Sequence, residues 1–138
     1  MIAYVDSSVV LRVVLRQTGA LPEWRNIERG VASALVGVEC LRTLDRLRLS
    51  QGVPDRQIAL RREAVYGIMG SLEVVEVNHT VLARAAQPLP TVLGTLDAIH
   101  LASAMLWQEH FGNPLIMATH DAALATAARA CGLRVIGL

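Results

Sequence analysis

The sequence predicts an α/β fold in which helices cover both faces of a parallel sheet of about four to five strands. Short apolar segments alternate along the chain with longer amphipathic segments, and this alternation is typical of parallel strands joined by helices. The chain has 138 residues, of which 53% are hydrophobic and only 4% are aromatic. Because this length is that of an ordinary domain, we expect one domain over residues 1–138 with an aliphatic core.

The first four elements follow from residue type and spacing. Residues 2–6 form a short apolar run and are predicted to be a buried strand, and residues 8–16 repeat apolar and arginine positions with helical spacing. Pro22 suits the first turn of a helix, so a helix is expected over residues 22–29. Residues 31–36 are small or β-branched, which favours a second buried strand.

The middle of the chain is predicted to form two helices and a strand. Residues 37–50 have leucines on one side and arginines on the other, so this helix is amphipathic and basic. Gly52 and Pro54 interrupt the pattern, and a second helix is expected over residues 55–70. Residues 72–77 alternate well enough to indicate a third strand.

The last third of the chain repeats the alternation of helices and strands. Residues 80–86 indicate a short helix, and residues 96–108 form a strongly apolar helix that we expect at the centre of the fold. The final strands are predicted over residues 114–118 and 133–137, with a helix over residues 121–131 between them. The whole order therefore predicts a sheet covered on both faces.

Basic residues in this chain are all arginines, 13 of them, and the net charge is +1. The absence of lysine excludes every mechanism that requires one, including the P-loop, the Schiff base and lysine-assisted phosphoryl-aspartate chemistry. A net charge this small predicts no general attraction to nucleic acid, although basic surface can offset an acidic site locally.

Cysteine use and hydropathy favour the cytoplasm. Cys40 and Cys131 lie in apolar helical contexts, which is typical of buried free thiols in a reducing compartment. No apolar run reaches the roughly 18 residues that a membrane span needs. The N-terminus has no basic leader, and Asp6 comes too early for a signal peptide.

Four acidic residues lie where an apolar run gives way to a predicted helix: Asp6, Glu39, Asp97 and Asp121. In a parallel sheet, such junctions gather along one edge. Each acid also has a structural explanation, since acids near a helix start accept backbone N–H groups and favour the helix dipole. Their common position nevertheless favours one shared site.

A shared site of four carboxylates would need a cation. The charges would repel one another and raise one another's pKa values unless they were spread apart, protonated or neutralised. Hard oxygen ligands select Mg²⁺ or Mn²⁺. Such a site can activate a water molecule and stabilise charge on a phosphodiester, so the acids predict a metal-dependent hydrolase.

Five segments, four of them around the acids, extend in order over nearly the whole chain: Tyr4–Ser8, Glu39, Thr95–Ala102, Thr119–Leu124 and Ala127–Ile136. In order and spacing they resemble the PIN-domain family, and specifically the VapC-type toxin ribonucleases of bacterial toxin–antitoxin pairs. The resemblance implies a PIN-like three-layer α/β/α sandwich with a central parallel sheet.

The resemblance also implies an activity, a site and partners. The activity is endoribonucleolytic cleavage that leaves a 5′-phosphate and a 3′-hydroxyl, with the four acids as catalytic residues and as ligands of Mg²⁺ or Mn²⁺. Ser7 and Thr119 would support the acids through hydrogen bonds, and Asp121 is expected to contribute least to direct metal contact. A VapB-type antitoxin, an RNA substrate and a second copy in a homodimer are the expected partners.

Further residues are candidates for RNA or antitoxin contacts, namely Arg12, Arg16, Arg42, Arg46 and His120. For the arginines, a solvated helix face is an equally good explanation, with Asp45 as a local partner. Relatives often have Asn, Arg or Tyr in place of His120, and an acid near Gln17, so substrate choice is expected to differ. His100 lies one turn after Asp97 and is interpreted as a core histidine rather than as a support for the site.

The sequence is also compatible with two functions other than a toxin ribonuclease. One is a PIN-like module that binds RNA or protein without turnover, against which the presence of all four acids counts. The other is a PIN nuclease that acts on DNA or in RNA maturation.

Overall fold

A computed structural model describes residues 1–138, and its centre is a sheet of five parallel strands. The strand order is β3-β2-β1-β4-β5, so the first strand of the chain lies at the middle of the sheet. The prediction of a parallel sheet of four to five strands is confirmed. The strands are β1 (Ile2–Val5), β2 (Arg29–Ser33), β3 (Glu73–Val75), β4 (Ile116–Ala118) and β5 (Arg134–Ile136).

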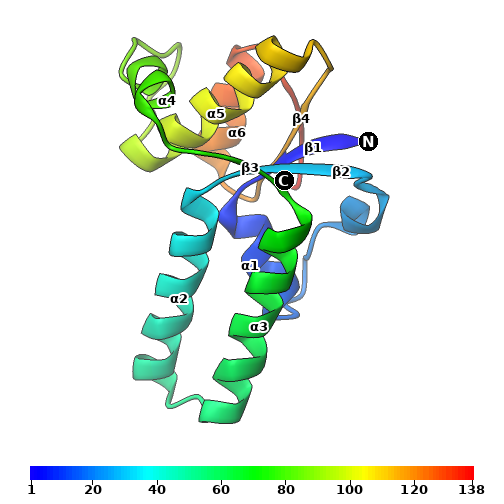
Figure 1. Cartoon of the computed structure of the whole chain (residues 1–138), viewed down its shortest axis with the longest axis vertical. Helices are drawn as coiled ribbons and strands as arrows, with labels where there is room; N and C mark the ends of the chain where they lie inside the picture. Colours follow the sequence, from blue (N-terminus) through cyan, green and yellow to red (C-terminus); the bar gives the residue numbers. More distant parts are fainter.

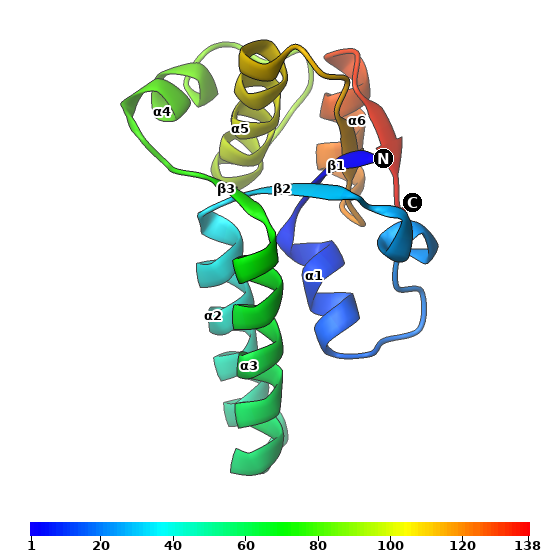
Figure 2. The ribbon, with the colours of Figure 1, turned by 45° about the vertical axis from the view of Figure 1, so that its right-hand side comes forward.

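Helices lie on both faces of the sheet, as the alternating sequence predicted. Helices α1, α2 and α3 lie on one side, and α4, α5 and α6 lie on the other (Figure 1). The three-layer α/β/α arrangement is also visible after rotation in Figure 2. The helices are α1 (Ser7–Val14), α2 (Leu35–Gln51), α3 (Asp55–Ser71), α4 (His79–Ala85), α5 (Thr95–Phe111) and α6 (Ala122–Ala130).

Alternating side chains of the central strands supply two separate cores. In β1, Ala3 and Val5 pack into the core under α1, α2 and α3. Tyr4 points to the opposite face, where it packs with residues of α5 and α6 such as Leu101 and Leu124. Because successive side chains of a strand point to opposite faces, one strand contributes to both layers, and the ends of β1 are fixed from both sides.

Two predicted boundaries are wrong, and both lie before the second strand. Instead of a helix over residues 22–29, the chain forms a short 3₁₀ helix, Pro22–Asn26. The backbone N–H groups of Glu28 and Arg29 donate to the Met1 carbonyl at 3.0 and 3.5 Å, so β2 begins earlier than predicted in order to pair with β1. The other predicted elements are present, with ends shifted by a few residues.

Helices α2 and α3 form a hairpin that extends well beyond the sheet (Figures 1 and 2). Gly52 ends α2 in the left-handed conformation, which glycine adopts without the steric cost of a side chain. Leu49 and Leu60 are 70% and 58% exposed, because no other element covers them. None of the helices is both long and apolar enough to cross a membrane.

Candidate active site

The topology brings the four acids to the edge of the sheet where the parallel strands end. Asp6 follows β1 directly and caps α1, and Asp121 lies three residues after the end of β4 and caps α6. Glu39 lies in the second turn of α2, just after β2, rather than at the head of its helix as predicted. Asp97 lies in the first turn of α5, which follows a loop rather than a strand.

Asp6 is the most buried of the acids, and its carboxylate is held on both oxygens. Only 3% of the residue is exposed. Its Oδ1 accepts hydrogen bonds from Ser8 Oγ at 2.6 Å and from the Val9 N–H at 3.3 Å. Its Oδ2 accepts one from Thr119 Oγ1 at 2.7 Å. Buried carboxylates need such donors, and these fix the orientation of Asp6.

Thr119 connects two of the acids. Besides donating to Asp6, its Oγ1 accepts the backbone N–H of Asp121 at 2.9 Å. Ser8 has a similar role, because its Oγ accepts the backbone N–H of His120 at 2.9 Å. The serine that supports the acids is therefore Ser8, whereas the predicted Ser7 contacts none of them and accepts only Cys40 Sγ at its carbonyl oxygen, at 4.0 Å.

A glycine near the C-terminus fits closely behind Thr119. Gly137 has a φ of 108°, and a Cβ at this position would collide with the Thr119 backbone. The Gly137 carbonyl also accepts a hydrogen bond from His120 Nδ1 at 2.5 Å. The turn that carries Thr119 and Asp121 thus depends on the absence of a side chain at Gly137.

Glu39 is linked to the core through a buried histidine. His100 Nε2 lies 2.6 Å from Glu39 Oε1, and His100 Nδ1 lies 2.8 Å from the Tyr4 hydroxyl. That hydroxyl also accepts the backbone N–H of Ser33 at 3.1 Å. Burial raises the pKa of the Tyr4 phenol far above its ordinary value, so the hydroxyl keeps its proton.

The acids influence one another electrostatically. Burial raises the pKa of Asp97, and the negative charge of Asp121 is the next largest cause. Asp6 and Glu39 raise this pKa further, whereas His100 lowers it. None of the four acids pairs with an arginine, and the one ion-pair contact among them joins Glu39 to His100. The edge of the sheet therefore carries uncompensated negative charge.

The donor set fits a hard cation in chemistry and charge. All four candidate ligands are carboxylates, the oxygen donors that Mg²⁺ and Mn²⁺ prefer. No three of the His, Cys, Asp and Glu side chains are arranged so that they could hold a metal ion as they stand. Burial is the main cause of the raised pKa of Asp97, and the charges of the other three acids raise it further, so a cation among these carboxylates would relieve their repulsion.

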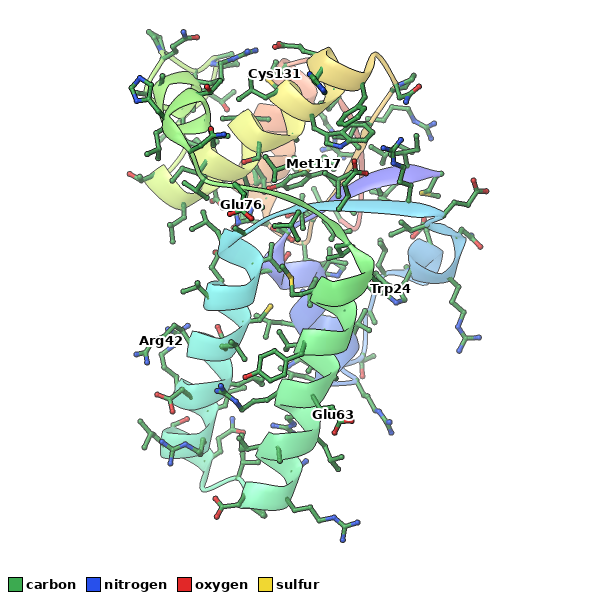
Figure 3. All side chains as sticks on the ribbon, in the orientation of Figure 1. Trp24, Arg42, Glu63, Glu76, Met117 and Cys131 are labelled. Atoms are coloured by element: carbon green, nitrogen blue, oxygen red, sulfur yellow. The ribbon has the colours of Figure 1, made fainter.

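The candidate contact residues occupy different surroundings. Arg42 and Arg46 follow Glu39 by three and seven residues on α2, so they continue its side of the helix along the hairpin. Figure 3 shows Arg42 directed away from the hairpin. Arg12 is tied to the turn after α1, where its Nη1 donates to the Gly19 carbonyl at 3.2 Å. Arg16 is exposed, with a φ of 51°.

Comparison with known proteins decides the family. A model of the PIN domain matches residues 3–130. The chain belongs to the PIN domain family. It is 32% identical to Ribonuclease VapC46 of Mycobacterium tuberculosis over 136 residues, which cover 96% of this chain and 95% of that protein.

Solved structures support the same PIN fold. A toxin–antitoxin complex from Klebsiella pneumoniae superposes with a TM-score of 0.64 and 13% identity, and the match covers 91% of this chain and 89% of the other. VapBC2 from Rickettsia felis, bound to a DNA fragment from its promoter, gives 0.66 and 11%, covering 98% and 97%. PAE2754 from Pyrobaculum aerophilum gives 0.62 and 21%, covering 97% and 83%.

Several features of this PIN domain were missed by sequence reasoning. Ser8, Gly137 and the link from Tyr4 through His100 to Glu39 were not assigned to the site. The spacing of Asp97 and His100 on one helix face was the available signal for the link. Nothing in the sequence indicated its partner Glu39, which lies 61 residues away along the chain.

Proposed function

We propose that this chain is a metal-dependent endoribonuclease that acts as the toxin of a type II toxin–antitoxin pair. The observation that carries the proposal is the group of four carboxylates at the end of the sheet, which repel one another and have no arginine partner. Selection for stability alone would favour neutralising such charges, whereas a cation-dependent hydrolase needs them free. The 32% identity to a mycobacterial ribonuclease supports RNA as the substrate.

In this proposal the ligands are Asp6, Glu39, Asp97 and Asp121, and the ion is Mg²⁺ or Mn²⁺. A divalent cation bound there supplies positive charge for the phosphodiester oxygens and acidifies a water molecule. The chain's own residues hold the geometry: Ser8 and Thr119 orient the carboxylate of Asp6, and Thr119 also fixes the backbone of Asp121. The cleaved ends are a 5′-phosphate and a 3′-hydroxyl.

Charge sets the order of binding. Without a cation, the carboxylates repel the phosphates of RNA, so productive RNA binding requires the metal first. Arg12, Arg16, Arg42 and Arg46 form no ion pair with the four acids and supply positive charge for RNA or for the antitoxin. His120 has a ring Nε2 that is buried without a hydrogen-bond partner, and we assign this residue a contact with RNA or with the antitoxin.

The proposed partners are a VapB-type antitoxin and a second copy of this chain. Two of the superposed structures are toxin–antitoxin complexes, which supports the antitoxin. A short reading frame immediately next to this gene, whose product copurifies with the chain and blocks cleavage, is the expected finding.

The decisive experiment is cleavage of a mixed RNA pool by the purified protein. We expect cleavage with Mg²⁺ or Mn²⁺, no cleavage with EDTA, and losses of at least about 100-fold for Asp6→Asn and Asp97→Asn. Asp45→Asn, an equivalent change on the hairpin, serves as the control and is expected to remain active. Full activity of both site variants would sink the assignment of the acids.

A further inference from the structure

The hydrogen bonds around His100 fit the tautomer whose ring proton is on Nε2. The Ser33 backbone N–H is a donor, so the Tyr4 hydroxyl accepts from it and has its own proton to give. That proton goes to His100 Nδ1, 2.8 Å away. Nδ1 is then an acceptor, the ring proton sits on Nε2, and Nε2–H donates to Glu39 Oε1 at 2.6 Å.

Burial makes this arrangement rigid. The Tyr4 side chain is fully buried and His100 is 1% exposed, so water does not offer either ring an alternative partner. A buried polar group that loses its partner is strongly disfavoured, which keeps all three hydrogen bonds formed together. We call this chain of hydrogen bonds from Tyr4 through His100 to Glu39 the relay. It joins β1, α5 and α2, and it fixes α2 at the position of Glu39.

The relay leaves Glu39 with one free oxygen. Oε1 is occupied by His100, and Oε2 has no protein partner. Asp6 differs, because protein donors hold both of its oxygens. Hydrogen bonds from residues that do not touch the ion commonly orient the carboxylates that bind it.

We propose that His100, oriented by Tyr4, is a positioning residue that holds Glu39 Oε1 and presents Oε2 to the divalent cation. This inference rests on the proposed function of the acidic site and adds a structural requirement to it. Glu39 then offers Oε2, the oxygen that accepts no protein hydrogen bond, and the direction of Oε2 is set by residues packed on the other face of the sheet.

The test compares Mn²⁺ affinity, measured by calorimetry or by electron paramagnetic resonance titration, with cleavage kinetics. We expect His100→Leu to weaken Mn²⁺ binding by about 10- to 100-fold and to lower kcat more than it raises KM. His100→Gln can place an amide N–H near the position of Nε2, so it is expected to recover most of the affinity. Tyr4→Phe is expected to give an intermediate loss.

A spectroscopic signature separates positioning from mere packing. The ¹⁵N shifts of the His100 ring are expected to show the Nε2–H tautomer in the wild-type protein and a mixture of tautomers in Tyr4→Phe. Leu101→Val is the matched control, since Leu101 is a fully buried neighbour on α5 without a polar group. We expect this variant to lower the melting temperature without changing Mn²⁺ affinity.

Unchanged Mn²⁺ affinity in folded His100→Leu, or equal losses in Leu101→Val, would overturn the positioning role. A wild-type protein that binds Mn²⁺ through Asp6 but does not cut RNA would contradict the proposed function alone, and the affinity series would still decide the role of His100. Failure of the wild-type protein to bind Mn²⁺ at all would overturn both.

Discussion

The two ends of helix α2 differ in whether their acidic side chains are paired with arginines. At the sheet end, Glu39 contacts His100 and joins three other carboxylates that have no arginine partner. At the hairpin end, Asp45 is paired with both Arg42 and Arg48, at 3.3 and 3.0 Å. The chain has ample arginine, so the missing counter-charge at the sheet end is a property of the site. Asp45 in the hairpin is therefore balanced by arginines, whereas the carboxylates at the sheet end have no arginine partner.

The largest difference between the two ends of α2 is expected when one carboxylate at each end is replaced by its amide. Glu39→Gln removes a charge from the site and should lower RNA cleavage by at least about 100-fold, whereas Asp45→Asn should leave it within about twofold. Single-turnover cleavage of one RNA by both variants measures the contrast. Equal losses would mean that the two ends do not differ in function.

A second prediction concerns a substitution that would displace the backbone of Thr119. Gly137→Ala forces a Cβ against the Thr119 backbone and should cost about 1–3 kcal/mol of unfolding free energy, with a loss of cleavage of about tenfold. Gly112→Ala is the matched control: Gly112 also has a positive φ, 68°, but a Cβ there meets nothing within 4 Å. Denaturant unfolding and cleavage assays of both variants separate backbone strain from displacement of Thr119. Equal loss of cleavage in both would contradict the proposed dependence.

The acidic end should also make stability depend on pH and metal. The pKa of Asp97 is higher in the folded protein than in the unfolded chain, so the folded state binds more protons between the two values. Without metal, stability should therefore fall as the pH rises from about 4 through the raised pKa, and Asp97→Asn should reduce this fall.

Metal should reverse that loss of stability. At 100 times its dissociation constant, Mg²⁺ or Mn²⁺ should add about 2.7 kcal/mol at neutral pH, which corresponds to a rise of several degrees in melting temperature. Thermal unfolding over a pH and metal series measures both effects. A melting temperature that is insensitive to millimolar metal would contradict the proposal that the carboxylates at the sheet end of α2 bind a cation.

The smallest effect is expected from the hairpin arginines. Joint replacement of Arg42 and Arg46 by alanine should change stability by less than about 1 kcal/mol, because their contacts are exposed. If these arginines contact RNA phosphates, the variant should bind RNA more weakly and with a shallower dependence on salt. Arg62→Ala, which removes an arginine stacked on Tyr66, is the control. Unchanged RNA and antitoxin binding would leave these arginines a solvated face only.

Much of the fold could be predicted because each element depends on nearby residues. The apolar run over residues 2–6 and the amphipathic pattern over residues 37–50 report their own secondary structure. The segment Pro22–Asn26 could not be predicted in this way, because pairing of the next residues with β1 limits its length. Local sequence cannot report a hydrogen bond to the Met1 carbonyl.

The candidate site shows the same division. Asp6 and Asp121 could be selected from the sequence because both the capping and the catalytic explanations place an acid directly at a helix start. Ser7 was predicted to support the acids, but the hydroxyl that donates to Asp6 is that of Ser8, because the helix that begins there sets the direction of each side chain.

The sequence by itself determined the alternation of strands and helices, the exclusion of mechanisms that require lysine, and the choice of the four acids. These depend only on residue type and local spacing. Only the tertiary structure decided that Glu39 has one oxygen held by His100 and the other free. That outcome depends on Tyr4, whose hydroxyl is directed by a strand pairing and a buried contact between distant segments. Hydrogen-bond direction in a buried network is a property of the assembled core, since each partner's role is set by the next.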